Sequence, residues 1–292
     1  MRKNLFRPMK PDEFLRAIED VARSHSCNDN FRAFCKAAYC ALAKRATPNR
    51  QRAQALEESF LSVVDAYGEE RPDCIERMGD LLERLKTTLY LTENDFLGLA
   101  YMESGLGNRG RGEAFSPTGV AQLLGRLIFP DTQRQDIAAV VATGEPFPLS
   151  DPACGSGVLT IQVAELLKYQ GFEVGRTLLA HMTDLNPVCF HMAFVQAELL
   201  GIPAVIERGD TLTLETFELA PTTKAMLEVY RRGMLQRRLD RTRAYEPRGS
   251  AAAPVDEGEA HPNPARPGAS SPRSASSKRW LEGQQGDLFD EE

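Results

Sequence analysis

The segment 151–157, which reads Asp-Pro-Ala-Cys-Gly-Ser-Gly, constrains the fold of this chain more than any other feature. An apolar-leaning run, residues 145–150, leads into it, and a helix-like run, residues 158–168, follows it. A strand that ends in an acidic residue, a tight glycine turn and the start of a helix form the ligand-binding corner of doubly wound α/β domains. The glycines let the backbone approach a ligand that a Cβ atom would keep away. We therefore expect an α/β domain around this glycine turn.

Strand and helix patterns alternate on both sides of the turn, between residues 145 and 214. The pattern predicts strands over 147–151, 178–184 and 204–209, and helices over 158–169 and 188–200. One more short strand fits within 211–219. Alternation at this spacing is typical of parallel βαβ units. The sequence thus predicts an α/β domain with a short, apparently truncated sheet.

The region before this domain lacks the alternation of strands and helices. Residues 1–104 are predicted to form an all-α N-terminal domain, since apolar residues recur there at helical spacing between turn signals. The expected helices begin at Pro11 and cover 30–44, 50–67, 72–89 and 93–102. A glycine-rich joint, 105–112, opens the α/β domain, which we bound at 105–245. Residues 115–120 are then expected to open a helix that continues through about Ile128.

The α/β domain is expected to end in a basic helix after Thr222. This helix carries seven cations: Lys224, Arg231, Arg232, Arg237, Arg238, Arg241 and Arg243. They could contact nucleic-acid phosphates, or they could form a solvated face balanced by acidic surface elsewhere. Residues 246–292 are rich in Pro, Ala, Ser and Gly, so we expect a disordered tail there.

Composition limits the classes of protein that remain. Net charge is -6, which is not the basic excess of a typical nucleic-acid binder, although the charge is unevenly distributed. No apolar run reaches the roughly 18 residues of a membrane span, and the N-terminus lacks the apolar core of a signal peptide. We therefore expect a cytoplasmic protein. The six cysteines have no spacing typical of metal sites, which predicts reduced, mostly buried thiols and no metal.

Four motifs follow one another in the order of a known family. The first is 115–120, which reads Phe-Ser-Pro-Thr-Gly-Val; the second is the glycine turn. Thr-Asp-Leu-Asn-Pro, 183–187, closes the second predicted strand, and Gly-Asp, 209–210, closes the third. This succession resembles the N6-adenine DNA methyltransferases, especially the modification subunits of type I restriction systems and their phage and plasmid relatives. The resemblance covers roughly residues 95–215.

The resemblance implies a Rossmann-like S-adenosylmethionine-dependent methyltransferase domain that acts on DNA. In the family, the first motif embraces the methionine end of the cofactor and the glycine turn wraps that end. The acid after the second strand binds the ribose hydroxyls, and the Asp after the third strand faces the adenine. The cofactor-binding residues that the resemblance implies are Phe115, Ser116, Pro117, Asp151, Pro152, Ala153, Cys154, Gly155, Ser156, Gly157, Asp184, Asn186 and Asp210. Ser116 replaces the usual Thr and keeps a hydroxyl. A dehydrogenase-type dinucleotide turn is the alternative, but the motif fits Gly-x-Gly-x-x-Gly poorly.

The sequence departs from the family at the catalytic loop. Relatives hold the flipped base with an (Asn/Asp)-Pro-Pro-(Tyr/Phe) loop after the fourth strand. This chain has 18 prolines, and no two are adjacent. We therefore assign no catalytic residue. Two hypotheses follow: an adenine-N6 DNA methyltransferase-like protein, or a cofactor- and DNA-binding module that needs a partner chain for methyl transfer. A protein or small-molecule methyltransferase is a third class.

One further motif lies near residue 292. Residues 285–289 read Gln-Gly-Asp-Leu-Phe and resemble the peptide by which bacterial proteins bind the replication sliding clamp. The resemblance implies that Gln285, Leu288 and Phe289 bind the clamp. A long tether that presents two apolar anchors suits such docking, whereas the alternative is an acidic tail with an incidental Leu-Phe pair.

Overall fold

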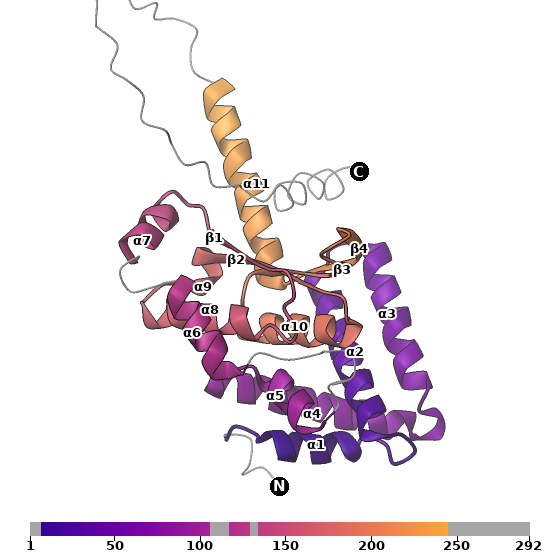
Figure 1. Ribbon diagram of the computed structural model, residues 1–292. Coiled ribbons are helices and arrows are strands. Elements are labelled where there is room, and N and C mark those ends of the chain that lie inside the picture. The colour runs from indigo at the N-terminus through magenta and orange to yellow at the C-terminus, as the bar shows by residue number, and fades with distance from the viewer. Residues whose placement is uncertain (1–6, 106–116, 129–133, 245–292) are drawn as a thin grey trace, which may run out of the picture. The chain divides into compact units, whose positions relative to one another are not determined.

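The computed structural model describes residues 7–105, 117–128 and 134–244. The chain divides into two units, Met1–Glu228 and Val229–Glu292. The first unit is a mixed α/β fold with a four-stranded sheet, which confirms the predicted α/β class (Figure 1). The expected tail, 246–292, and most of the glycine-rich joint lie outside the described residues.

Helices dominate the N-terminal part of the first unit, as the periodicity predicts. They are α1 (Pro11–Glu19), α2 (Cys27–Ala46), α3 (Arg50–Asp65), the 3-10 turn η1 (Gly68–Glu70), α4 (Arg71–Thr92) and α5 (Phe96–Glu103). Side-chain caps explain several starts, because they satisfy amides that lack a helical partner. Ser26 accepts from the Asp29 amide at 3.1 Å, and Asn49 accepts from the Arg52 amide at 2.9 Å.

The fifth helix begins later than the sequence predicts. Residue 93 was the expected start, but Glu93 has a left-handed φ of 50° and ends α4 instead. The chain then turns, and α5 begins at Phe96 with Asp95 as its N-cap. The expected start was wrong because a left-handed non-glycine residue leaves no clear mark in the sequence.

The α/β part follows the predicted order closely. Its elements are α6 (Thr118–Ile128), α7 (Arg134–Ala142), β1 (Phe147–Asp151), α8 (Val158–Tyr169), α9 (Val174–Thr177), β2 (Leu178–Asp184), α10 (Pro187–Leu200), β3 (Ala204–Asp210), β4 (Glu215–Pro221) and α11 (Thr223–Ala244). The helices α7 and α9 are not in the prediction. The basic segment after Thr222 forms α11, which crosses from the first unit into the second.

The sheet has the order β1-β2-β3-β4. The first three strands are parallel, and β4 runs antiparallel to β3. Their register sets Asp151 beside Met182 and Asp184 beside Arg208. The carboxyl ends of β1, β2 and β3 therefore meet at one edge of the sheet, where ligands bind in open α/β sheets.

The fourth strand is anchored by the N-terminal helices. The Tyr39 hydroxyl of α2 donates to Glu218 at 2.5 Å, and Arg52 of α3 donates to the Leu219 carbonyl. The sequence predicted a short strand within 211–219, whereas β4 covers Glu215–Pro221 and residues 211–214 form the turn before it. Because the hydrogen bonds and contacts that hold β4 come from residues far away in sequence, a local pattern could not give its exact bounds.

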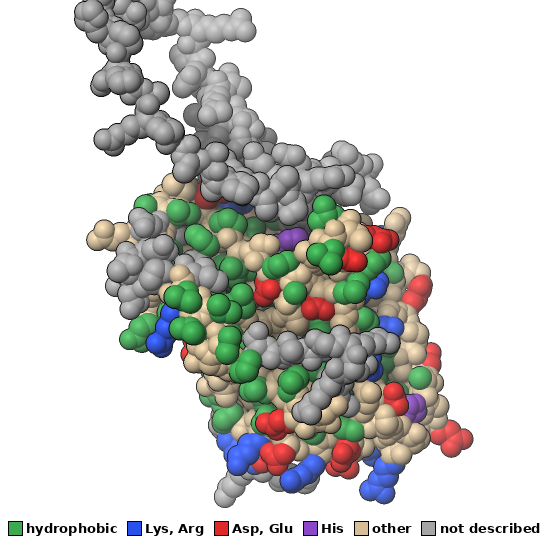
Figure 2. Space-filling view, viewed as in Figure 1, with side chains coloured by type: hydrophobic (Ala, Val, Ile, Leu, Met, Phe, Trp, Pro, Cys, Tyr) green, Lys and Arg blue, Asp and Glu red, His purple; other side chains and the backbone are tan. Residues whose placement is uncertain are grey.

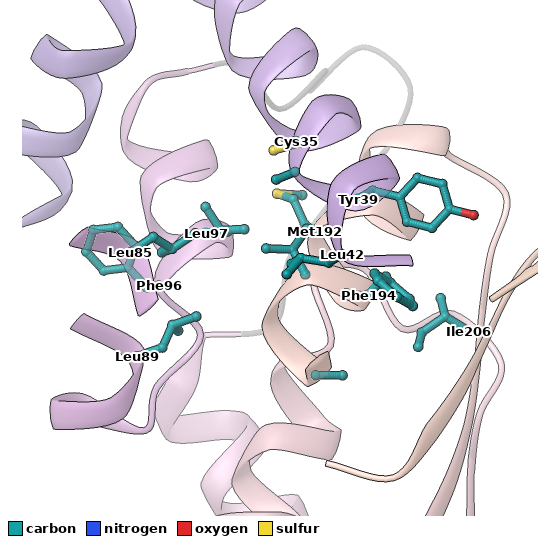
Figure 3. Close-up of a cluster of buried hydrophobic side chains, with 14 of the residues drawn as sticks. Cys35, Tyr39, Leu42, Leu85, Leu89, Phe96, Leu97, Met192, Phe194 and Ile206 are labelled. Atoms are coloured by element: carbon teal, nitrogen blue, oxygen red, sulfur yellow. The ribbon is translucent and has the colours of Figure 1, made fainter. Parts of the chain in front are cut away.

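One continuous core joins the helices to the sheet. Figure 3 shows side chains from α2, α4, α5, α10 and β3 in this core. The Tyr39 ring lies 5.1 Å from the Phe190 ring and 5.0 Å from the Phe194 ring, measured between centroids. Leu85 and Leu97 are completely buried. The N-terminal helices and the first part of the sheet thus share one hydrophobic interior.

The helix α6 packs against α8 through small residues. Ala121 is buried, and a Cβ at Gly125 would come within 3.9 Å of Val163 on α8. The other sides of α6 expose Val120, Leu123, Leu124 and Leu127. Hydrophobic side chains gather over this helix in Figure 2. Within the part of the chain that the structure describes, no helix is both long and apolar enough to cross a membrane.

Candidate functional site

The glycine turn after β1 has the conformation that its sequence predicts. Gly155 has a φ of 56° and Gly157 a φ of 93°, both in the left-handed region that favours glycine. The Cys154 amide donates to the Thr183 carbonyl of β2 at 2.9 Å. The Gly157 amide donates to the Cys154 carbonyl at 2.8 Å, which closes the turn before α8 begins at Val158.

Asp184 binds this turn directly. One of its carboxylate oxygens accepts from the Gly155 amide at 2.8 Å, and the other accepts from the Asn186 amide at 2.8 Å. The side chain is half-buried, and its carboxylate joins the end of β2 to the turn that follows β1. The turn and the acid of the next strand, predicted separately as cofactor residues, are thus parts of one hydrogen-bonded corner.

Asp151 ends β1 directly before the glycine turn. Its carboxylate accepts from the Ala153 amide at 3.4 Å. Burial raises the pKa of the Asp151 carboxyl more than this hydrogen bond lowers it, and the Asp184 carboxylate adds to the rise. Two acids therefore share one small region, where they favour a ligand that carries positive charge.

Asp210 shapes the neighbouring turn. Its carboxylate accepts from the Leu212 amide at 2.8 Å and from the Thr213 amide at 3.2 Å. The Thr211 hydroxyl donates to the Pro152 carbonyl at 2.6 Å, so the turn between β3 and β4 is tied to the glycine turn. These contacts bring together the three strand ends that the sequence motifs marked.

The open side of the corner also carries apolar side chains. Leu185 directly follows Asp184 and is 60% exposed; Leu212 directly follows Asp210 and is 94% exposed. Pro152 and Ala153 are exposed as well. Carboxylates beside exposed leucines suit a ligand with both hydroxyl groups and a flat apolar surface.

Two other predicted site residues, Asn186 and Cys154, stabilise the structure of this corner. The Asn186 side chain accepts from the Val188 amide at 2.8 Å and caps α10. Cys154 is buried, and burial raises the pKa of its thiol well above the usual value, with Asp184 and Asp151 adding to the rise. A neutral buried thiol is a poor nucleophile. Cys154 therefore packs the turn.

The first predicted motif is only partly described. Phe115 and Ser116 lie outside the described residues. Pro117 is exposed, and its carbonyl accepts from the Val120 amide at 2.8 Å as α6 begins. Because α6 packs on α8, the helix after the first motif lies against the helix after the glycine turn.

Two residues that the sequence reasoning missed complete the corner from behind. Asp95 accepts from the Ser156 hydroxyl at 2.6 Å, and Gln196 of α10 donates to Asp95 at 2.8 Å. All three side chains are buried. The available signal was an Asp directly before an apolar run, which is typical of an N-cap, but it does not reveal the contact with Ser156, 61 residues away.

Comparison with known proteins adds little to this geometry. No model of a known protein family and no curated protein matches the chain. Among solved structures, the chain is similar to a Listeria monocytogenes protein described as a class I S-adenosylmethionine-dependent methyltransferase, with 15% identity and a TM-score of 0.33. The match covers 69% of this chain and 54% of that protein, so this chain spans about half of the protein's length. A TM-score of this size does not establish a common fold, so the function rests on the site itself.

Proposed function

We propose that the glycine corner binds S-adenosylmethionine and that the chain is an adenine-N6 DNA methyltransferase-like protein. The observation that carries the proposal is the Asp184 carboxylate, which ends β2 at the carboxyl edge of the sheet and accepts from the Gly155 amide of the glycine turn. S-Adenosylmethionine has ribose hydroxyls that need such an acceptor. Its sulfonium and ammonium groups are positively charged, which suits a corner with Asp151 and Asp184 close together.

The corner also offers groups for the two ends of this cofactor. The first amides of α8 have no helical acceptor, so they can bind the methionine carboxylate. The exposed Leu185 and Leu212 offer apolar surface to the adenine ring. The ordered motifs of the sequence support the same assignment, with Asp184 on the ribose and Asp210 near the adenine.

Titration calorimetry with S-adenosylmethionine tests this proposal. We expect the full chain to bind the cofactor, and we expect Asp184→Ala to weaken binding at least about tenfold, since hydrogen bonds to a charged group are each worth roughly 1.5–3 kcal/mol. The matched control is Asp80→Ala on the exposed side of α4, which should bind as the wild type does. A wild-type chain that shows no binding heat and no thermal stabilisation by the cofactor would refute the proposal.

DNA is the proposed acceptor substrate, and α11 is the element proposed to bind it. Lys224 and Arg231 lie on its described part, and more cations follow in its sequence. If these cations bind phosphates, affinity for a DNA duplex should fall steeply as salt rises, because each contact releases counterions. Salt-independent binding, or none, would contradict this part of the proposal.

A second candidate function is favoured by the missing Pro-Pro loop. On this view the chain holds cofactor and DNA, and a partner chain supplies the groups that aim the adenine amine at the methyl group. Transfer of a labelled methyl group to DNA, with and without co-encoded partner proteins, separates the candidates. Transfer by the chain alone supports the complete enzyme; transfer only in the presence of a partner supports the module.

The clamp-binding peptide stays a separate proposal, since Gln285, Leu288 and Phe289 lie outside the described residues. Recovery of the chain on immobilised sliding clamp should be lost in the double variant Leu288→Ala/Phe289→Ala. Equal recovery of both proteins would refute it.

A further inference from the structure

A buried polar cluster lies behind the glycine turn, on the side away from the proposed ligand. It consists of Asp95 on the approach to α5, Ser156 in the turn and Gln196 on α10. Their exposed fractions are 4%, 0% and 0%. Buried polar side chains of this kind are costly unless every group has a partner.

Hydrogen bonds join the whole cluster. Ser156 donates from its hydroxyl to one Asp95 oxygen at 2.6 Å, while Gln196 and the Gly98 amide donate to the other at 2.8 and 3.0 Å. The same Gln196 amide group donates to the Ser156 carbonyl at 2.9 Å, and its oxygen accepts from the Leu97 amide at 2.9 Å. Two helices and the glycine turn are thereby fixed to one carboxylate.

Helix capping alone does not explain this arrangement. A cap needs one acceptor for the Gly98 amide, and a Ser or Asn side chain provides it without a buried charge. Burial raises the pKa of the Asp95 carboxyl despite its three hydrogen bonds, so the carboxylate is kept at a cost. The second oxygen of this carboxylate accepts the hydrogen bond from the Ser156 hydroxyl, which lies outside α5.

The first turn of α5 is also shaped around this contact. A Cβ added at Gly98 would lie 2.2 Å from an Asp95 oxygen and 2.3 Å from the Ser156 hydroxyl oxygen. Real Cβ atoms do not approach other atoms so closely. Glycine at this position therefore leaves the space in which Asp95 and Ser156 meet.

We propose that Asp95 is a positioning residue for the cofactor corner: through Ser156 it fixes the glycine turn that presents the Gly155 amide to Asp184. Ser156 stands between the two left-handed glycines, so a shift of its side chain alters the direction of both neighbouring peptide groups. The inference rests on the proposed function, because the corner that Asp95 fixes is the proposed S-adenosylmethionine site.

The test compares Asp95→Ala with Asp95→Asn in the full chain. Asp95→Ala should weaken S-adenosylmethionine binding about tenfold or more in calorimetry, the equivalent of one lost hydrogen bond to a charged group. Asp95→Asn should restore most of the affinity, because its oxygen can accept from Gly98 and Gln196 while its amide donates to the Ser156 oxygen.

A matched control separates positioning from general loss of stability. Asn30 is also buried in the helical part, where it donates to the Ile18 and Ala22 carbonyls and accepts from Tyr67. Asn30→Ala should lower the unfolding temperature yet leave the cofactor affinity within about twofold of the wild type. An equal loss of affinity in this control would overturn the proposal, as would wild-type affinity in a folded Asp95→Ala protein.

Hydrogen exchange gives a readout that needs no cofactor. In the ligand-free protein, Asp95→Ala should speed exchange of the turn amides, notably Gly155 and Gly157, while Asn30→Ala should not. If the wild type does not bind the cofactor, the proposed function fails, but faster exchange still supports the positioning role. Unchanged exchange in both Asp95 variants would refute that role. If Asp95→Ala does not fold, Ser156→Ala carries the test, because it removes the same hydrogen bond from the turn: exchange of the turn amides that is faster than in the wild type supports the role, and unchanged exchange refutes it.

Discussion

The two sides of the glycine turn are built differently. On the buried side, Ser156, Asp95 and Gln196 are closed off from solvent and their hydrogen bonds go to one another or to backbone amides and carbonyls. On the open side, Asp184 is only half-buried, and Leu185 is largely exposed. The buried side sets the shape of the turn, and the open side carries the residues that we propose to bind the cofactor. Substitutions on the buried side should therefore change stability as well as affinity, whereas those on the open side should change stability little.

The largest effect is expected on the buried side, at Gly98. Gly98→Ala inserts a Cβ into the space between Asp95 and Ser156 and should lower the free energy of unfolding by about 3 kcal/mol, as overpacking does in tight interiors. Gly79→Ala is its matched control: this glycine lies exposed in α4, with no atom within 4 Å of the added Cβ. The control should gain up to about 1 kcal/mol from helix propensity. Urea unfolding of both variants measures the contrast, and equal stabilities would show that the space is not tight.

A second expectation concerns pH. The pKa of Asp95 is raised above its ordinary value of 3.8, chiefly by burial, so the folded state binds this proton more tightly than the unfolded state does. Its contribution to stability is thus fully present below that value and is lost as pH rises through the folded pKa. Asp95→Asn lacks this titration. Its stability relative to the wild type, measured by urea unfolding, should rise as pH is raised above 3.8. A constant difference would mean that Asp95 titrates normally.

The sequence predicted the open side of the turn far better than the buried side. Asp151, Asp184 and Asp210 each end a strand whose apolar run and flanking turn are visible locally, so their meeting at one edge follows from parallel topology. The bond between Asp95 and Ser156 joins residues 61 apart and depends on how α5 packs. Local periodicity does not predict how α5 packs. Even the start of α5 was predicted wrongly, because the left-handed Glu93 ends α4 at the residue where α5 was expected to begin.

The strands of the sheet show the same difference between what local sequence predicts and what long-range contacts decide. The positions of β1 and β2 were predicted to the residue, because apolar runs between turns mark them. The antiparallel direction of β4 and its hydrogen bonds to α2 and α3 were not predicted, since Tyr39 lies 179 residues from Glu218. The motifs thus located the candidate site, while long-range contacts decide how firmly it is held.

A smaller effect is expected on the open side, at Leu185. Leu185→Ala removes an exposed side chain, so the free energy of unfolding should change by less than about 0.5 kcal/mol. If the adenine of the cofactor covers this side chain, affinity should fall about fivefold, which corresponds to roughly 1 kcal/mol of lost apolar burial. Calorimetry with S-adenosylmethionine measures it. Unchanged affinity would remove Leu185 from the proposed site.

The smallest effect is expected at Thr211, whose hydroxyl ties the β3–β4 turn to the Pro152 carbonyl in an exposed position. Thr211→Val should cost no more than about 0.5–1 kcal/mol, because water can replace the lost donor. Thr222 gives the buried counterpart: its hydroxyl accepts from the Ala204 amide at 3.0 Å and donates to the Ile202 carbonyl at 2.9 Å. Thr222→Val should cost about 1–3 kcal/mol, since these two groups and the Ala225 amide, all buried, lose their partner. If urea unfolding gave Thr211→Val the larger loss, the open side would be helping to hold the turn's shape, and the division between a shape-setting side and a ligand-facing side would fail.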